Sequence, residues 1–257
     1  MGQKLGQHFL TRPEIALWVV DAGGVSKEDT ILEVGPGHGI LTRALLLQGK
    51  NVVAIEKDVT LVGELKKTFA EDIKKGRLLL LEEDVRDFDP STCNALKKGY
   101  KLIANIPYYI TGQIIRKFLT TSHQPESISL LIQKEVAVRI VARDNKHSIL
   151  SLSVHVYGSP KLEKVVKAGA FSPPPKVDSA VLSIHDISKK HFEEGGAEED
   201  RFFEIIKTAF SQKRKMIGGT LKDVVNENAF THCTVDPKTR PQDVSLEHWL
   251  CLAKLSK

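Results

Sequence analysis

The chain has 257 residues, of which 41% are hydrophobic and 27% charged, and its formal net charge is +5 at pH 7. Such a composition is typical of a globular protein with one large domain, or with a large and a small one. No apolar run reaches the roughly 18 residues of a membrane-spanning helix, and the N-terminus lacks the apolar core of a signal peptide. The positive charge favours a polyanionic partner such as a nucleic acid.

The sequence contains three cysteines, Cys93, Cys233 and Cys251, which lie far apart. Their spacing does not match that of a metal site, so the sequence predicts no metal ion. So small a number of cysteines indicates a reducing, cytoplasmic setting.

The chain begins with a short segment, Gly6-Gln7-His8-Phe9-Leu10, that mixes polar and apolar side chains. Thr11 is a suitable N-cap for a helix that extends to about Ala22, because Pro13 and Glu14 fall in its first turn. The segment before this helix either closes over a ligand or simply anchors the chain in the core.

A β-prone run over residues 30–34 ends in the glycine loop Gly35-Pro36-Gly37-His38-Gly39, and a helical pattern follows over residues 40–48. The backbone N–H groups of such a loop can approach a nucleotide-like ligand without obstruction by Cβ atoms. The dinucleotide-binding fingerprint needs its third glycine where this chain has Ile40. A nicotinamide-dependent oxidoreductase is therefore disfavoured.

A carboxylate follows each of the next two predicted strands. Glu56 comes after residues 51–55 and 21 positions beyond Gly35, where an acidic side chain can accept hydrogen bonds from ribose hydroxyls. Asp84 comes shortly after residues 78–81 and is placed to accept from the amino group of an adenine. The alternative for this acidic run is a solvated turn.

An apolar run over residues 102–104 predicts a buried strand, and it ends in Asn105-Ile106-Pro107-Tyr108. Ligands of open α/β sheets bind at the carboxyl ends of the strands. Asn105 can donate and accept hydrogen bonds, Pro107 offers a carbonyl without an N–H, and Tyr108 offers a flat stacking face. This set suits a planar substrate with an amino group, such as a nucleobase; the alternative is an ordinary turn.

The remaining elements of this part alternate between strands and helices. A helix begins near Thr111, a strand covers residues 127–133, a helix covers 134–142, and strands are predicted over 149–157, 162–166 and 177–184. Such alternation, followed by strands without a long helix between them, predicts an α/β fold. Its sheet is doubly wound, with an antiparallel edge.

Three successive prolines occur in the segment Phe171-Ser172-Pro173-Pro174-Pro175-Lys176-Val177-Asp178-Ser179. They fix an extended loop, which holds Phe171 at low entropic cost. Phe171 is then either a second stacking surface for a base or a plug on the core.

Glu193-Glu194-Gly195-Gly196 marks a junction, and helical patterns follow over residues 201–210, 216–225 and 246–255. We therefore expect a sheet domain over residues 1–187 and a small helical domain over 188–257. A cationic cluster, Lys213-Arg214-Lys215, lies between the first two of these helices. It is either a solvated surface or a contact for nucleic-acid phosphates.

Seven features of the chain together resemble the ribosomal RNA adenine dimethyltransferases, the KsgA type that modifies RNA of the small subunit. They are GQHFL at 6–10, EVGPGHG at 33–39, Glu56, Asp84, NIPY at 105–108, FSPPPKVDSAV at 171–181 and FSQKRKM at 210–216. They occur in the family's order over nearly the whole chain, and the NIPY and FSPPPKVDSAV elements together are highly specific.

The resemblance implies a seven-stranded, Rossmann-like class I methyltransferase sheet that binds S-adenosylmethionine. The family's cofactor-binding positions correspond to His8, Leu10, Gly35, Gly37, Glu56, Asp84 and Asn105. His8 departs from the family, which more often has Asn there. A backbone contact is unaffected by this change, whereas a side-chain contact requires His to act as the donor. In the family a Gly precedes Leu-Ser near residue 148, where this chain has Ser148-Ile149-Leu150-Ser151.

The resemblance also implies methyl transfer to the exocyclic amine of an adenine. We hypothesise that this nitrogen attacks the sulfonium methyl in line. Its two N–H groups meanwhile donate hydrogen bonds to the Asn105 side-chain oxygen and the Pro107 carbonyl. These bonds favour a pyramidal nitrogen with a localised lone pair. Tyr108 stacks on the base, and Phe171 is the candidate for its other face. These four residues form the predicted catalytic set.

The implied function is dimethylation of adjacent adenosines near the 3′ end of 16S ribosomal RNA, in an immature small subunit, by a monomeric cytoplasmic enzyme. Lys213, Arg214 and Lys215 are the predicted RNA-binding residues of this ribosome-biogenesis factor. The alternatives are a large-subunit adenine methyltransferase of the antibiotic-resistance type and a non-catalytic RNA-binding assembly factor with the same fold. The QKRKM stretch and the Arg240-Pro241 segment favour the small-subunit type.

Overall fold

The computed structural model describes residues 8–212 and 214–256. The chain divides into two compact units, Met1–Ala137 with Pro160–Ile187 and Val138–Ser159 with Ser188–Lys257. We call them the sheet unit and the helical unit. The division into domains at residue 187 stays a prediction. Residues 138–159 belong to the helical unit, although that division places them in the first domain.

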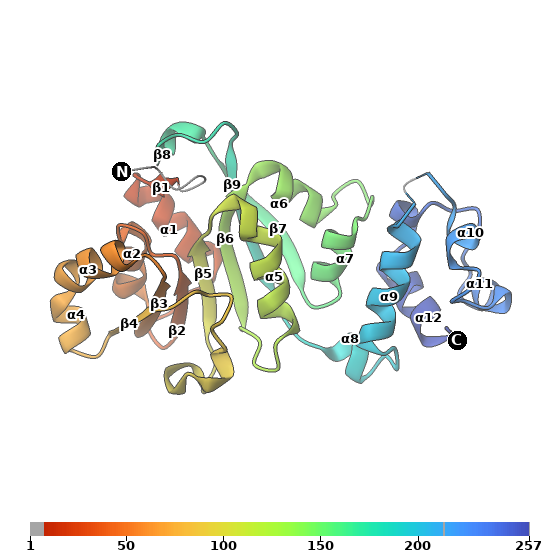
Figure 1. Ribbon diagram of the computed structural model, residues 1–257, viewed down its shortest axis with the longest axis horizontal. Coiled ribbons are helices and arrows are strands. Elements are labelled where there is room, and N and C mark those ends of the chain that lie inside the picture. Colours follow the sequence, from red (N-terminus) through yellow and green to blue (C-terminus); the bar gives the residue numbers. More distant parts are fainter. Residues whose placement is uncertain (1–7, 213, 257) are drawn as a thin grey trace. The chain divides into compact units, whose positions relative to one another are not determined.

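The sheet unit is organised around seven strands in the order β4-β3-β2-β5-β6-β9-β7 (Figure 1). Neighbouring strands from β4 to β6 are parallel, and β9 is antiparallel to β6. The strands cover Thr30–Val34 (β2), Asn51–Glu56 (β3), Leu78–Glu82 (β4), Lys101–Asn105 (β5), Ser127–Gln133 (β6), Ser159–Val166 (β7) and Ser179–His185 (β9). The predicted α/β fold with an antiparallel edge is confirmed.

The central strands are buried on both faces, which explains why their sequences are almost continuously apolar. Side chains on one face of the sheet, among them Ile31, Ala54 and Ile103, share a core with side chains of helices α1 (Pro13–Ala22) and α2 (Ile40–Gln48). Side chains on the other face, such as Leu32 and Leu102, are also fully buried. The sheet is therefore covered on both faces, as a doubly wound fold requires.

Six helices accompany these strands in the part of the chain that the structure describes, and the N-cap of the first differs from the predicted one. They are α1 Pro13–Ala22, α2 Ile40–Gln48, α3 Val59–Thr68, α4 Ala70–Lys74, α5 Thr111–Thr120 and α6 Lys134–Val141, with 3-10 turns at Pro90–Thr92, Asn94–Leu96, Tyr108–Ile110 and Ala168–Ala170. The N-cap predicted for α1 is wrong, because Arg12 holds that position without a side-chain cap. The Thr11 hydroxyl donates instead to the Ala170 carbonyl (2.9 Å).

Two further strands, β1 (Phe9–Leu10) and β8 (Phe171–Ser172), form a separate antiparallel pair (Figure 1). Phe9 pairs with Ser172 and Leu10 with Phe171. The N–H of Thr11 also donates to the Ala170 carbonyl (2.9 Å). This pair joins the N-terminal segment to the proline-rich loop, a contact that neither segment reveals by itself.

The helical unit packs its helices around aromatic side chains. Phe202 and Phe203 of α9 and Trp249 of α12 are buried, and the two Phe rings meet edge to face. The elements are α7 Ile149–His155, α8 Lys190–Glu193, α9 Glu199–Phe210, α10 Ile217–Leu221, α11 Glu227–His232, the 3-10 turn Pro241–Asp243 and α12 Leu246–Lys254. The helices predicted near α9 and α12 are confirmed, whereas α10 is shorter than the pattern over 216–225 predicts.

The strand predicted over residues 149–157 is wrong, because Ile149–His155 forms α7. This run alternates apolar and polar residues, a pattern typical of a strand. A reciprocal cap decides the outcome. The Ser148 hydroxyl accepts from the Ser151 N–H (3.1 Å), and the Ser151 hydroxyl accepts from the Ser148 N–H (2.7 Å). These bonds satisfy two N–H groups that a helix start leaves without partners.

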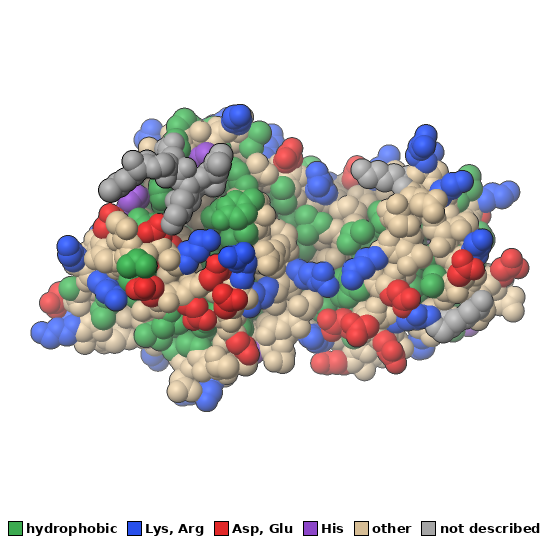
Figure 2. Space-filling model, in the orientation of Figure 1, with side chains coloured by type: hydrophobic (Ala, Val, Ile, Leu, Met, Phe, Trp, Pro, Cys, Tyr) green, Lys and Arg blue, Asp and Glu red, His purple; other side chains and the backbone are tan. Residues whose placement is uncertain are grey.

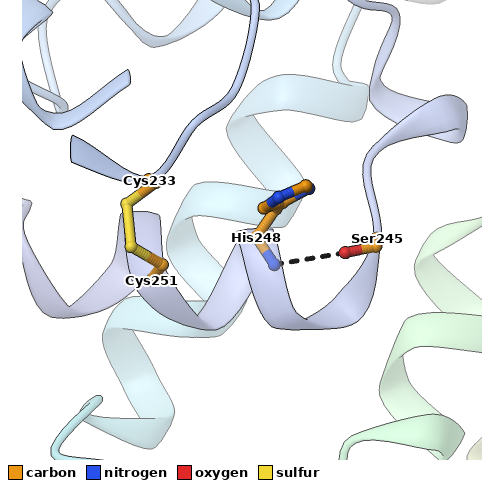
Figure 3. Close-up of a disulfide and its surroundings, with 4 residues drawn as sticks. All are labelled: Cys233, Ser245, His248 and Cys251. Carbon is orange, nitrogen blue, oxygen red and sulfur yellow. Dashed lines mark hydrogen bonds between the residues drawn. A yellow bond between two sulfur atoms is a disulfide. The ribbon is translucent and has the colours of Figure 1, made fainter. Parts of the chain in front are cut away.

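Cys233 and Cys251 form a disulfide within the helical unit (Figure 3). Cys233 directly follows α11, and Cys251 lies in α12, whose start is capped by Ser245 accepting from the His248 N–H (3.3 Å). The bond closes a loop with a sequence separation of 18 residues. A disulfide is unusual in the reducing setting that the cysteine count indicates. Cysteine spacing does not predict this pair, because the pairing depends on tertiary packing.

We expect the disulfide to stabilise the helical unit by about 3 kcal/mol, because closing a loop of this length removes conformational entropy from the unfolded chain. The double substitution Cys233→Ser and Cys251→Ser, or a reducing agent, should lower the melting temperature by several degrees in calorimetry. Cys93→Ser is the matched control, since Cys93 is a free thiol. Identical melting of the reduced and oxidised wild-type protein would contradict this expectation.

Candidate active site

A cleft opens at the carboxyl ends of the parallel strands, the usual ligand site of an open α/β sheet. The last residue of β2, Val34, pairs with Ile55 of β3 and Ala104 of β5, so the residues that follow these three lie side by side. The cleft belongs to the sheet unit and is lined by residues 8–10, 34–38, 40, 41, 55–57, 83–86 and 105–110. All seven predicted cofactor positions, and also Pro107 and Tyr108, are among these lining residues.

The glycine loop forms one wall of the cleft. Gly35 and Gly37 have positive φ angles of 68° and 58°, which residues other than glycine rarely adopt. Gly37 also lies against the Phe9 ring, because a Cβ atom on Gly37 would stand 2.9 Å from Phe9 Cδ1. Both the backbone conformation and the close approach of β1 therefore require glycine at this position.

Glu56 ends β3 and is only 6% exposed. Its Oε1 accepts from the N–H groups of Lys57 (2.9 Å) and Asp58 (3.0 Å), and its Oε2 accepts a long bond from the Gly37 N–H (3.4 Å). The backbone thus uses most of the capacity of Oε1, while Oε2 keeps room for another donor. A carboxylate held in this way can accept hydrogen bonds from ligand hydroxyls.

Asp84 is clamped by Arg86, two residues later. Asp84 Oδ1 accepts from the N–H and the Nε of Arg86 (both 3.0 Å), and Oδ2 accepts from a terminal guanidinium nitrogen (2.6 Å). These bonds, aided by the charges of Arg86 and Lys57, lower the pKa of Asp84 to about 2, so it is an anion at neutral pH. Arg86 was not among the predicted site residues, although an Asp-x-Arg run close behind a strand is a visible signal.

Asn105 and Pro107 present two acceptors to the cleft. The Asn105 side-chain amide donates to the His8 carbonyl (3.4 Å), which leaves its Oδ1 as the acceptor of that side chain. The Pro107 carbonyl accepts from the Ile110 N–H (3.2 Å), and a carbonyl oxygen has a second lone pair. A ligand amine with two N–H groups can therefore be received by these two oxygens.

Tyr108 is fixed through its hydroxyl, which forms a hydrogen bond with Ser179 Oγ at the start of β9 (2.7 Å). Burial raises the pKa of this phenol, so it is neutral at physiological pH. The next residue, Tyr109, is 67% exposed at the rim of the cleft. Tyr108 therefore contributes a half-buried ring of fixed orientation to the cleft wall.

The paired strands β1 and β8 place the remaining predicted residues. The His8 ring donates from Nδ1 to the Pro173 carbonyl (2.8 Å) and lies 5.5 Å from the Tyr108 ring. Leu10 is buried in the core of the sheet unit. Phe171 is 4% exposed in the same core and is not one of the described residues that line the cleft. Burial favours the core-plug reading of Phe171, and its stacking role stays a prediction.

The predicted RNA-binding residues belong to the helical unit. Lys213 lies outside the described residues, whereas Arg214 and Lys215 are exposed between α9 and α10. Several Lys and Arg side chains lie along the upper right edge of the helical unit in Figure 2. Within residues 8–212 and 214–256, no cluster of His, Cys, Asp or Glu could hold a metal ion, and no helix is long and apolar enough to cross a membrane.

Glu33 of β2 is a carboxyl group without solvent exposure. Neither of its oxygens has a hydrogen-bond partner among the described residues, and the same holds for the buried Thr42 hydroxyl. Burial, together with the nearby charge of Glu56, raises the pKa of Glu33 to about 8, so the group is mainly protonated at pH 7. It was not predicted as a site residue, although its place within an apolar strand is a visible signal.

Known proteins resemble this chain over nearly its whole length. Residues 2–257 match the family model described as Ribosomal RNA adenine dimethylase. A relative named Ribosomal RNA small subunit methyltransferase A, from Dehalococcoides mccartyi, is 37% identical over 258 residues, which cover 96% of this chain and 86% of the relative.

Two solved structures share the fold. A dimethyladenosine transferase from Plasmodium falciparum has a TM-score of 0.80 at 24% identity, over 95% of this chain and 96% of its own. The 23S rRNA methyltransferase ErmE has a TM-score of 0.75 at 22% identity, over 96% of this chain and 99% of its own. At such identities the likeness shows that the fold is shared.

We expect Glu33→Gln to remove a pH dependence of stability. A carboxyl whose pKa is raised in the folded state contributes fully to the free energy of unfolding below its unfolded pKa of 4.5. It loses that contribution as the pH rises toward 8. Between about pH 5 and 8, the free energy of unfolding of the wild type should therefore fall relative to that of the variant, by a few kcal/mol.

Denaturant titrations at several pH values measure this difference. Glu82→Gln is the matched control, because Glu82 is exposed at the end of β4. A constant difference between wild type and Glu33→Gln across the range would show that Glu33 is not protonated in the folded protein.

Proposed function

Because the chain belongs to the ribosomal RNA adenine dimethylase family, we propose that it dimethylates the exocyclic amines of two adjacent adenosines near the 3′ end of 16S ribosomal RNA. Its substrate is the maturing small subunit, and it acts as a monomer in the cytoplasm. One observation carries the proposal: Asn105, Pro107 and Tyr108 line the same cleft as the glycine loop and two carboxylates.

We assign S-adenosylmethionine to the part of the cleft that the glycine loop forms. The residues fit this cofactor, since the Gly35 and Gly37 backbone at positive φ faces the ligand without Cβ atoms, Glu56 Oε2 can accept from ribose hydroxyls, and Asp84 is an anion that can accept from an adenine amine. The assigned residues are His8, Leu10, Gly35, Gly37, Glu56, Asp84 and Asn105. When bound, the cofactor supplies an electrophilic methyl group on a sulfonium.

Residues of the chain act on the target adenine rather than on the methyl donor. In the first methyl transfer, the two N–H groups of the amine donate hydrogen bonds, one to Asn105 Oδ1 and one to the Pro107 carbonyl, the two acceptors with remaining capacity. Both bonds favour a pyramidal nitrogen whose lone pair is localised and therefore nucleophilic. No strong base is needed, because the nitrogen becomes cationic once it carries the new methyl group, and it then loses its proton to water. Catalysis rests on positioning and on fixed dipoles.

Tyr108 is the platform on which the target base stacks after it has left its own stack in the RNA. Its hydroxyl bond to Ser179 sets the plane of the platform before the base arrives. Phe171 is the fourth residue of the predicted catalytic set. Because its ring is buried in the core of the sheet unit, stacking by Phe171 on the second face of the base requires the 171–179 loop to move.

One experiment separates the proposal from its two alternatives, a large-subunit adenine methyltransferase and a non-catalytic assembly factor. The relative at 37% identity is named for the small subunit, whereas ErmE, named for 23S rRNA, is 22% identical. Immature small and large subunits are each incubated with the protein and labelled S-adenosylmethionine. Label in the small subunit alone supports the proposal, and label in the large subunit overturns it. Binding without label identifies a non-catalytic assembly factor.

We expect Asn105→Ala to lose methyl transfer by about 100-fold or more, because the amine loses an acceptor that orients it. Binding of S-adenosylhomocysteine, measured by calorimetry, should be largely kept, because the glycine loop, Glu56 and Asp84 still hold the cofactor. Asn51→Ala is the matched control, because Asn51 lies at the amino end of the parallel strand β3, away from the carboxyl ends that form the cleft. Full activity of Asn105→Ala would contradict the role assigned to this residue.

The double substitution Arg214→Gln and Lys215→Gln should weaken binding to small-subunit RNA. Losing two phosphate contacts reduces the slope of log affinity against log salt by about 1.4 for unpaired RNA. Filter binding at several salt concentrations measures this slope. Lys74→Gln with Lys75→Gln is the control, since both lysines are exposed at the end of α4. An unchanged slope in the first double variant would place the RNA elsewhere.

A further inference from the structure

His8 is the residue at which two segments of the cleft meet the proline-rich loop. Its ring donates from Nδ1 to the carbonyl of Pro173, at 2.8 Å. Its main-chain carbonyl accepts from the Asn105 side chain, at 3.4 Å. Its ring centroid lies 5.5 Å from that of Tyr108, with an interplanar angle of 32°. The N-terminal strand, the proline-rich loop and the NIPY turn are thus linked through one side chain and its backbone.

The bond to Pro173 defines which ring nitrogen of His8 carries a proton. A carbonyl oxygen can only accept, so Nδ1 carries the proton, and in the neutral ring Nε2 has the lone pair. An Asn side chain places an N–H donor at the same number of bonds from Cα as His Nδ1. A Gln side chain places its donor one bond further out. Asn can therefore replace this contact, whereas Gln and Ala cannot.

The 171–179 loop holds Tyr108 in two ways. Ser179, at one end of the loop, bonds to the Tyr108 hydroxyl at 2.7 Å. Pro173, near the other end, holds the His8 ring that lies beside the Tyr108 ring. The position of this ring is therefore set by where the loop sits, and the His8–Pro173 bond is one of the contacts that hold the loop.

We propose that the His8 imidazole is a positioning residue for the target base, acting through the loop and Tyr108, and that only its main chain serves the cofactor side of the cleft. This inference rests on the role proposed for Tyr108 as the stacking platform. Among the described residues, the β1–β8 ladder contains two residue pairs, so the side-chain bond is a substantial part of what ties the two segments together. A displacement of about 1 Å at a reacting group can cost on the order of 100-fold in rate.

The test compares His8→Ala, His8→Asn and His8→Gln in three measurements. These are the single-turnover rate of methyl transfer to immature small subunits at saturating cofactor, the Kd for S-adenosylhomocysteine by calorimetry, and the melting temperature. His8→Ala and His8→Gln should be slower by about tenfold or more, with a Kd close to that of the wild type. His8→Asn should recover most of the rate, because it restores the donor to Pro173.

Thr11→Val is the matched control, since the Thr11 hydroxyl bonds the same two segments through Ala170 and Thr11 is not among the described residues that line the cleft. It should shift the melting temperature as His8→Ala does and leave the rate unchanged. The proposal is overturned by an unchanged rate in His8→Ala, by equal rates in the Asn and Gln variants, by rate losses in Thr11→Val as large as in His8→Ala, or by a weakened Kd with a normal saturated rate.

A wild-type protein that methylates no adenine fails the proposed function and removes the basis of this inference. A wild type that methylates adenine, with His8 variants that behave as the wild type, fails this inference alone. The two failures are therefore distinguishable in one set of assays.

Discussion

The parallel register of β2, β3 and β5 is the constraint on which the cleft depends. The partners of the last β2 residue are Ile55 and Ala104, which sets Gly35, Glu56 and Asn105 side by side. Because side chains alternate along a strand, a slip of one residue would turn these functional groups away from the cleft. Burial of the strands on both faces opposes such a slip, so the hydrophobic core fixes the chemistry at its edge.

Local patterns were sufficient for the elements that follow directly from burial. Continuous apolar runs located the central strands, and the glycine spacing located the turn before α2. The alternating run over 149–157 fits a strand as well as a helix, and the Ser148–Ser151 cap resolves that ambiguity only through hydrogen-bond geometry. The N-cap predicted at Thr11 fails for a related reason. The Thr11 hydroxyl donates to the distant Ala170 carbonyl and does not accept from an N–H group of α1.

The site could be predicted as a set of positions but not as a set of contacts. Strand ends converge in a parallel sheet, so motif spacing was enough to bring the carboxylates and the NIPY turn together. The clamp of Arg86 on Asp84, the bond from His8 to Pro173 and the burial of Phe171 depend on side-chain directions. They also depend on long-range pairing between β1 and β8, which no local pattern encodes. The disulfide was missed on the same ground.

The attachment of β1 outside the main sheet has a kinetic consequence. Two residue pairs and a few side-chain contacts hold this strand over the glycine loop, whereas the seven-stranded sheet continues without it. Local opening of so small an element costs far less than global unfolding. The rate at which β1 opens and the rate at which the seven-stranded sheet unfolds can therefore change independently.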